Sequence, residues 1–156
     1  MPKIDESLAP KRRGSRYPSP YDEPCRGRES VSLGDAAKLT KLGAHKVRLD
    51  PGAWSSQRHW HDREDELVYV LEGEVTLVTD EGKTVLVAGD SAGFPAGTRD
   101  GHCFQNHGPT HAVLLVVGTR DDEDSGEYSD IDMKFGRGRY TGSGGPTFTK
   151  KDGTPF

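Results

Sequence analysis

Hydrophobic and polar positions alternate in short runs through the middle of the chain, between His45 and Gly118. The runs end every six to ten residues at turn-forming sequences such as DPG at 50, DEGK at 80 and NHGP at 106. This pattern predicts antiparallel strands in a barrel or sandwich, since no long stretch keeps the i, i+3, i+4 apolar spacing of a helix. The segment 32–39 is at most a short helical turn. The expected strands are 45–49, 54–61, 66–72, 74–79, 83–88, 90–94, 101–106 and 111–118.

Two of these strands are apolar on both faces. The sequence ELVYVL at 66–71 places two valines on one face and Leu, Tyr and Leu on the other, and HAVLLVVG at 111–118 is similar. A strand of this kind must be covered on both sides. The pattern therefore favours a homodimer over a monomer, although cover by other parts of the same chain would satisfy the same requirement.

The two ends of the chain differ from its middle. Apolar residues make up only 31% of the chain and concentrate centrally, whereas 1–30 is rich in Pro, Arg and Ser and 119–156 is acidic at first and then rich in Gly. We expect one domain, with an N-terminal arm at 1–30, a β-barrel at 31–118 and a C-terminal arm at 119–156. The arms are either flexible tails or segments that pack on the barrel or on a partner subunit. Candidate packing anchors are Tyr17, Tyr21, Ile131, Met133, Phe135, Phe148 and Phe156.

Charge and composition exclude several partners. Acidic residues outnumber basic ones by 25 to 21, so no overall positive field attracts nucleic acid or an anionic membrane. No apolar stretch approaches the roughly 20 residues that span a bilayer, and the N-terminus lacks the apolar segment of a signal peptide. We expect a cytoplasmic protein whose partner is a small molecule or another protein. Cys25 and Cys103 form no CxxC pattern, which predicts two free thiols.

Metal-binding chemistry is indicated by the stretch GAWSSQRHWHDREDELVYVLEG at 52–73. His59 and His61 lie two apart on an expected strand, so their rings share a face and can converge on one ion. Such a pair alone is more often an ordinary surface feature. Glu66 changes that balance, because it begins the next strand on the face of the buried valines, where an unpaired carboxylate needs a cation or a proton. The neighbouring Glu64 and Asp65 are expected to be solvated in the turn.

A second polar cluster lies in GDSAGFPAGTRDGHCFQN at 89–106. On the expected strand, His102, Phe104 and Asn106 face one way and Cys103 faces the other, so Cys103 is expected to be a buried or interface thiol. The remaining histidines are expected to be ordinary surface or core residues. They are His45, His107 and His111.

The two clusters together resemble the paired motifs of the cupin superfamily, small antiparallel jelly-roll barrels (double-stranded β-helices), and in particular small single-domain bacterial cupins. The matching positions are Gly52, His59, His61, Glu66 and Gly73 in the first motif, and Gly89, Pro95, Gly97, His102 and Asn106 in the second. The resemblance implies a metal ion held by His59, His61, Glu66 and His102. The sequence departs from the usual pattern twice, with six residues instead of five between Gly52 and His59 and four instead of two between Gly97 and His102.

A cupin with this ligand set is expected to bind one divalent transition metal ion, such as Fe, Mn, Ni, Cu or Zn, with open positions for a ligand. The expected function is a metal-dependent enzyme of dioxygenase, decarboxylase or isomerase type, acting on a small substrate that chelates the ion through oxygen. The alternative is a non-catalytic ligand-binding or sensory cupin with a structural ion. A transcription regulator would need a helix-turn-helix that the N-terminal arm does not offer, and a sugar-nucleotide epimerase would not need this metal set.

The pocket beside this ion is expected to be largely apolar. Arg99 is a candidate for an anionic substrate group, whereas Arg58 is expected to point outward. The expected pocket residues are Gln57, Val68, Val70, Phe94, Arg99 and Phe104.

Overall fold

A computed structural model describes residues 3–144 and 147–156. It is built almost entirely from antiparallel strands, as the sequence predicts. The helical segments within the described residues are η1 (Glu23–Cys25) and α1 (Leu33–Ala36), which is the short turn expected at 32–39. The largest sheet has the strand order β1 (Lys11–Arg13), β2 (Arg28–Ser32), β3 (Leu42–Leu49), β9 (Ala112–Thr119), β4 (Glu66–Glu72), β7 (Ser91–Phe94).

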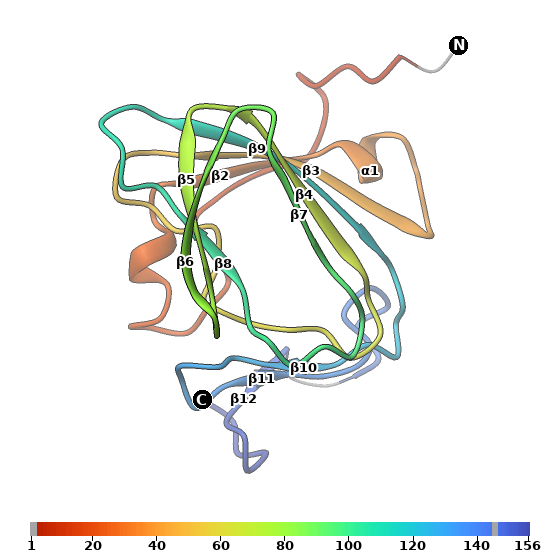
Figure 1. The fold of residues 1–156 in the computed structure, drawn as a ribbon. Coiled ribbons are helices and arrows are strands. Elements are labelled where there is room, and N and C mark those ends of the chain that lie inside the picture. Colours follow the sequence, from red (N-terminus) through yellow and green to blue (C-terminus); the bar gives the residue numbers. More distant parts are fainter. Residues whose placement is uncertain (1–2, 145–146) are drawn as a thin grey trace.

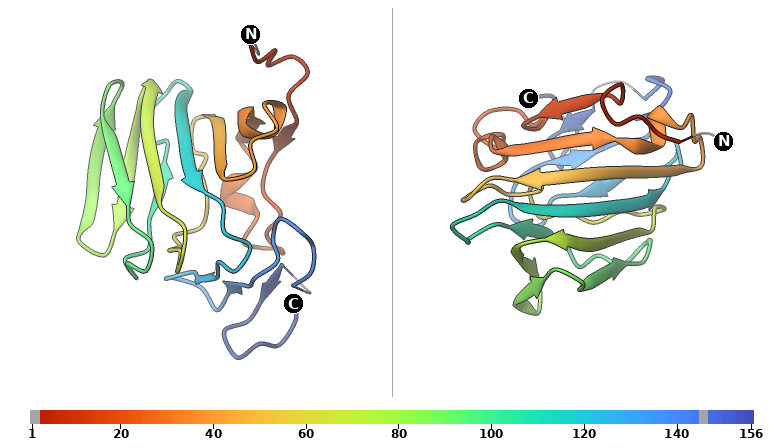
Figure 2. Two further views of the ribbon diagram at one scale, coloured as in Figure 1. Left: turned by 90° about the vertical axis from the view of Figure 1, so that its right-hand side faces the viewer. Right: turned by 90° about the horizontal axis from the view of Figure 1, so that it is seen from above.

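Two smaller sheets complete the fold. One has the order β6 (Gly82–Val87), β5 (Glu74–Thr79), β8 (Cys103–Gln105), and the other β10 (Gly126–Glu127), β11 (Lys134–Phe135), β12 (Phe148–Thr149). In Figure 1 the β5–β6–β8 sheet faces the large sheet, and β10–β12 lie across one end of the space between them. Figure 2 shows the same arrangement from two further directions.

The main core lies between the two facing sheets. Alternate residues of β3, β9 and β4 point inward, so Val47, Leu114 and Val70 lie side by side in register and are almost fully buried. The opposite sheet contributes Val75 and Phe104. Each such side chain contributes about 1.5–3 kcal/mol relative to an exposed position. Apolar side chains therefore fill one end of the space between the two sheets, and polar residues line the other end.

Most expected central strands are confirmed within one or two residues, and β4 and β5 have the predicted bounds. The prediction of a strand at 54–61 is wrong. There the chain bends and pairs only through isolated bridges, from Trp54 to Gln105 and from His59 to His102 and Tyr128. This polar stretch has no continuous partner strand, so it forms no ladder of backbone hydrogen bonds. His59 is held instead by two isolated bridges.

Both ends of the chain contribute strands and pack against the centre. β1 and β2 extend the large sheet, and β2 spans the position where the N-terminal arm was expected to end. A second apolar cluster forms around the buried residues Tyr128, Met133 and Phe135. The expected anchors Tyr17, Tyr21, Ile131 and Phe148 pack against it, while Phe156 remains 49% exposed and contacts the ring of Tyr21.

Close backbone approach brings the start of the C-terminal segment to the histidine stretch. The backbone N–H of Trp60 donates to the carbonyl of Glu127, at 3.2 Å, and that of Asp62 donates to the carbonyl of Ser125, at 2.8 Å. Gly126 lies between them, and a side chain on it would overlap the carbonyl oxygen of Trp60 and the ring of Phe135. Glycine is required here because only hydrogen fits. This contact places the segment that contains Asp124 beside His61.

The outward face of β4 is exposed. Leu67, Tyr69 and Leu71 are 48%, 40% and 41% exposed, whereas the intervening Val68 and Val70 are buried. The N-terminal residues cover only another part of this sheet, where Glu6 forms an ion pair with Lys46 of β3. Among the described residues, no helix has the length and apolar character needed to cross a membrane.

Candidate metal centre

Three of the predicted ligands lie together at the polar end of the interior. One donor atom from each of His59, His61 and Glu66 lies within 4.8 Å of the other two. Glu66 begins β4 and sits opposite Gly118 of β9 and Phe94 of β7, which fixes the direction of its side chain. Two imidazole nitrogens and a carboxylate oxygen at this spacing can coordinate one cation.

His102 lies beside this group. Its Nε2 is 3.1 Å from Oε1 of Glu66, and its ring centroid is 5.0 Å from that of His59. The backbones of His59 and His102 exchange two hydrogen bonds, and the ring of Phe94 stacks on His102 at 3.5 Å. The fourth predicted ligand is therefore directed at the same carboxylate, in a hydrogen bond that a cation could replace.

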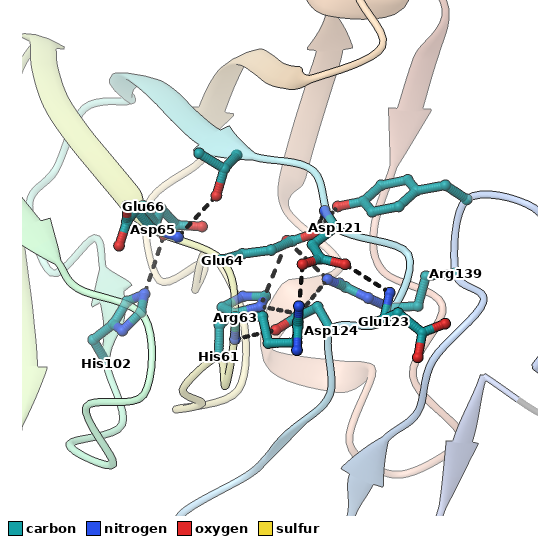
Figure 3. Close-up of polar contacts among 12 residues, drawn as sticks. His61, Arg63, Glu64, Asp65, Glu66, His102, Asp121, Glu123, Asp124 and Arg139 are labelled. Carbon is teal, nitrogen blue, oxygen red and sulfur yellow. Dashed lines mark hydrogen bonds and ion pairs between the residues drawn. The ribbon is translucent and has the colours of Figure 1, made fainter.

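Two of the histidine rings are oriented through their Nδ1 atoms. Nδ1 of His59 lies 3.0 Å from the carbonyl oxygen of Gln57, and Nδ1 of His61 lies 2.8 Å from Oδ2 of Asp124 (Figure 3). In each case the oxygen acceptor keeps the proton on Nδ1. The lone pair of Nε2 is then free to bind a metal. His102 differs, because its buried Nδ1 has no partner among the described residues. Its ring is held by the stack on Phe94 and by the hydrogen bond between its Nε2 and Glu66.

The electrostatic environment suits a cation. Burial, together with the nearby His102 and His61, lowers the pKa of His59 to about 3. Burial alone would raise the pKa of Glu66, but the hydrogen bond to His102 and the neighbouring histidines outweigh it and lower this pKa to about 2. At neutral pH the site therefore presents a neutral imidazole at His59 and an ionised carboxylate at Glu66, which are the forms that bind metals.

Glu64 is a correction to the sequence prediction. It was expected to be solvated, yet it is only 6% exposed. Its carboxylate accepts hydrogen bonds from the hydroxyl of Tyr140 at 2.7 Å, from Arg139 at 2.8 Å and from the backbone N–H of Asp121 at 2.9 Å. The neighbouring Asp65 is exposed, as expected. Glu64 is buried because its partners come from the C-terminal segment, which folds over it.

A second acidic group adjoins the first, formed by His61, Glu64 and Asp124. Here the positive charge is already present, because the guanidinium of Arg139 lies 2.8 Å from Glu64 and 2.6 Å from Asp124 (Figure 3). Asp124 is fully buried and also accepts from the backbone N–H of Arg63. We therefore assign this cluster to the support of His61 and the anchoring of the C-terminal segment.

A cavity of about 620 Å³ opens beside the donor group and includes His59, His61, Glu66 and His102 in its wall. Two of the expected pocket residues, Val68 and Phe104, lie in its wall. The other expected pocket residues lie elsewhere. Val70 is in the apolar core, Gln57 donates to the carbonyl of Tyr21, Phe94 lies behind His102, and the exposed Arg99 stacks on Trp60.

The remaining histidines and Arg58 take different positions in the fold. Arg58 forms ion pairs with Asp80 and Asp130 on the surface. His107 contacts the side chain of Gln105, and His111 contacts Glu72, as ordinary surface histidines. His45, by contrast, lies in the cavity wall.

Sequence reasoning missed the polar residues that the two arms bring to this cavity. The N-terminal segment contributes Arg12, Arg16, Tyr17 and Arg28, and the C-terminal segment contributes Tyr128, Arg139 and Tyr140. One signal was available. In β2 (RESVS) the alternating positions 28, 30 and 32 are polar, which reads as an exposed face unless the interior is itself polar.

Comparison with known proteins agrees with this architecture. The cupin domain family model matches residues 45–118. A sugar phosphate isomerase of the cupin superfamily from Silicibacter pomeroyi is 43% identical, with 99% of this chain and 96% of that chain covered and a TM-score of 0.89. A putative sugar phosphate isomerase from Acidithiobacillus ferrooxidans is 36% identical, with 70% of each chain covered and a TM-score of 0.67. The polyketide cyclase RemF from Streptomyces resistomycificus is 22% identical, with 78% and 80% covered and a TM-score of 0.62, and shows similarity of fold alone.

Among curated protein sequences, none matches this chain significantly. The antiparallel fold and the histidine–glutamate group define a cupin with a candidate metal site. The chain belongs to the cupin superfamily, as its similarity along nearly the whole length of the Silicibacter protein shows.

Proposed function

We propose that this cupin is a metal-dependent isomerase of a small hydroxycarbonyl compound, in which a proton moves between neighbouring carbons. The observation that carries the proposal is the group of His59, His61 and Glu66, whose donor atoms converge in the wall of a cavity large enough for a small organic molecule. Two similar proteins described as sugar phosphate isomerases support the isomerase class over the dioxygenase and decarboxylase classes.

The side chains present fit a divalent transition ion. His59, His61, Glu66 and His102 would hold it, and Gln57 and Asp124 fix two of the imidazoles with Nε2 free. When bound, such an ion acts as a Lewis acid toward a carbonyl or hydroxyl oxygen. Histidine and carboxylate donors suit Fe, Mn, Ni, Cu or Zn alike, so the donor set defines a class of ion.

His45 is our candidate for the proton-transfer group. It lies in the cavity wall on β3, opposite Val116 of β9, and makes no side-chain hydrogen bond within the described residues. Burial, and next the positive charge of Arg28, lower its pKa, so the ring is neutral at pH 7 and able to accept a proton. Glu64 also lines the cavity, but both its oxygens are already hydrogen-bonded. His45 would take the substrate proton and return it.

The proposal extends to a homodimer. The exposed apolar residues on the outside of β4, namely Leu67, Tyr69 and Leu71, form a face that the described arms leave uncovered. A second copy of this chain offers the same face, and two-fold symmetric contact of this kind is the commonest oligomeric arrangement.

The test combines metal content with turnover. Protein purified without added metal is measured by elemental analysis and then incubated with aldose and ketose sugars, phosphorylated and free, with product isomers followed by NMR. We expect about one transition metal ion per chain and isomer exchange. His59→Ala should lose the ion, whereas the surface variant His111→Ala should keep both the ion and activity.

The variant His45→Gln should keep the ion and lose most turnover. Metal-free protein that is fully folded and active would overturn the metal-centre proposal. A metal-bound protein that binds sugars without converting any of them would instead support the alternative of a ligand-binding cupin with a structural ion.

A further inference from the structure

Three arginines on one side of the cavity have no carboxylate partner among the described residues. They are Arg12 of β1, Arg16 in the following loop and Arg28 of β2, and all three line the cavity. The other two arginines in the cavity wall are neutralised, since Arg120 pairs with Asp35 and Arg139 pairs with Glu64 and Asp124. Within the described residues, these three guanidinium groups therefore line the cavity without an ion-pair partner.

The strand register explains why Arg12 and Arg28 face the cavity. Arg12 lies opposite Ser30 in the β1–β2 pair, and Ser30 lies opposite the core residue Val47 in the β2–β3 pair. Arg28 is two residues from Ser30 on the same strand, so it shares that inward face. The neighbouring Arg13 faces the other way and pairs with Asp50. The alternation of β1 thus separates an arginine that lines the cavity from one in a surface ion pair.

Arg28 shows the strongest sign of a missing partner. Its Nη1 donates to the carbonyl of Gly14 at 3.4 Å and to the hydroxyl of Ser30 at 3.2 Å, but its Nε is buried and has no partner among the described residues. Burial and the charge of Arg12 both lower the pKa of Arg28, although a guanidinium stays protonated. A buried donor on an unpaired cation is unfavourable until an anion accepts from it.

The arginines and the metal donors share one cavity and are linked through two tyrosine rings. The ring of Tyr17 packs edge-on against Tyr128 at 5.3 Å between centroids, and Tyr128 lies 5.7 Å from the ring of His59. Tyr17 and Arg28 both line the cavity. A single ligand in this cavity would have its oxygens at the histidines and an anionic group at the arginines.

From this geometry we infer that Arg28, Arg12 and Arg16 form a subsite for a phosphate monoester, so that the ligand of this cavity is a short phosphorylated hydroxycarbonyl compound. The inference rests on the proposed function for the metal-chelating end only. Guanidinium groups present forked donors that match the oxygens of a phosphate, and three uncompensated positive charges suit its double negative charge better than the single charge of a carboxylate.

The test measures binding of inorganic phosphate by calorimetry, to the protein as isolated and again after treatment with a chelator, so that capture by a metal is excluded. We expect Arg28→Gln to weaken phosphate binding about tenfold or more, and Arg12→Gln to weaken it less, because each removes charge-assisted hydrogen bonds. The matched control Arg13→Gln removes the same charge from the opposite face of β1 and should leave binding unchanged. Since Arg12 is exposed on an edge strand, its variant tests the subsite even where Arg28→Gln fails to fold.

The outcomes separate this inference from the proposed function. Phosphate binding that depends on Arg28 and Arg12 supports the subsite even in a protein that isomerises nothing. Phosphate binding that is absent, or equal in Arg12→Gln, Arg28→Gln and Arg13→Gln, overturns the subsite, including in a protein that isomerises free sugars. Malonate or acetate that binds more tightly than phosphate at the same arginines overturns the phosphate assignment.

Discussion

Substitution of Asp124 by Asn tests how the chain prepares His61 for a metal. The carboxylate of Asp124 is fully buried, and its Oδ2 accepts from Nδ1 of His61 and from Arg139, while its Oδ1 accepts from the backbone N–H of Arg63 (Figure 3). An amide of the same shape has only one oxygen. If that oxygen stays with Arg63, the new NH₂ group faces two donors.

The consequence for His61 is a change of tautomer. A donor at position 124 favours an unprotonated Nδ1, and the proton then moves to Nε2, the atom that must bind the ion. Loss of such an outer partner typically weakens metal affinity about 10–100-fold, which corresponds to about 1.4–2.7 kcal/mol. The variant should also be less stable by about 1–3 kcal/mol, because one buried donor is left unsatisfied.

The assay is a competition titration of one divalent ion between the protein and a chelating dye, at fixed pH, with circular dichroism to confirm folding. Glu64→Gln is the matched control. It removes one charge from the same Arg139 cluster, but its oxygen is 3.7 Å from Nδ1 of His61, beyond hydrogen-bond distance. A folded Asp124→Asn protein with the affinity of the wild type would refute the reasoning, and equal losses in both variants would show that charge matters instead of the hydrogen bond.

Two further predictions concern the cysteines and the outer face of the sheet. Cys25 and Cys103 are free and buried, and burial raises the pKa of each thiol to about 11, so at pH 8 both should react with a disulfide reagent only after denaturation, and fast reaction of the native protein would contradict their placement. The double variant Leu67→Lys, Tyr69→Lys should convert the proposed dimer to a monomer in light scattering; a wild-type protein that is already monomeric would remove the basis for this dimer.

The central strands could be predicted from sequence because short runs of apolar residues are separated by turn-forming sequences. β4 and β5 have the expected bounds for that reason. The prediction of a strand around His59 is wrong because two isolated bridges position this residue without a continuous ladder of hydrogen bonds. Alternation indicates burial only where the interior is apolar. In β2 the inward residues are Arg28, Ser30 and Ser32, so the usual pattern is reversed.

The grouping of His59, His61 and Glu66 could be predicted from local spacing, whereas the support around it could not. Glu64 has the same chemical character in sequence as the exposed Asp65 beside it. It differs because Arg139 and Tyr140, some 75 residues further along the chain, fold onto it. Partners this distant leave no local pattern, so a charge in a turn reads as solvated even where it is buried.

The position of the cavity residues along the chain also bears on substrate choice. His59, His61, Glu66 and His102 all lie within residues 45–118, the part that matches the general cupin model. The uncompensated arginines and the tyrosines of the cavity lie outside that range. A match to the central part alone therefore covers the candidate metal donors and does not include these cavity residues. Similarity along nearly the whole chain, as with the Silicibacter protein, includes the arms, and it is the arms that would distinguish one cupin substrate from another.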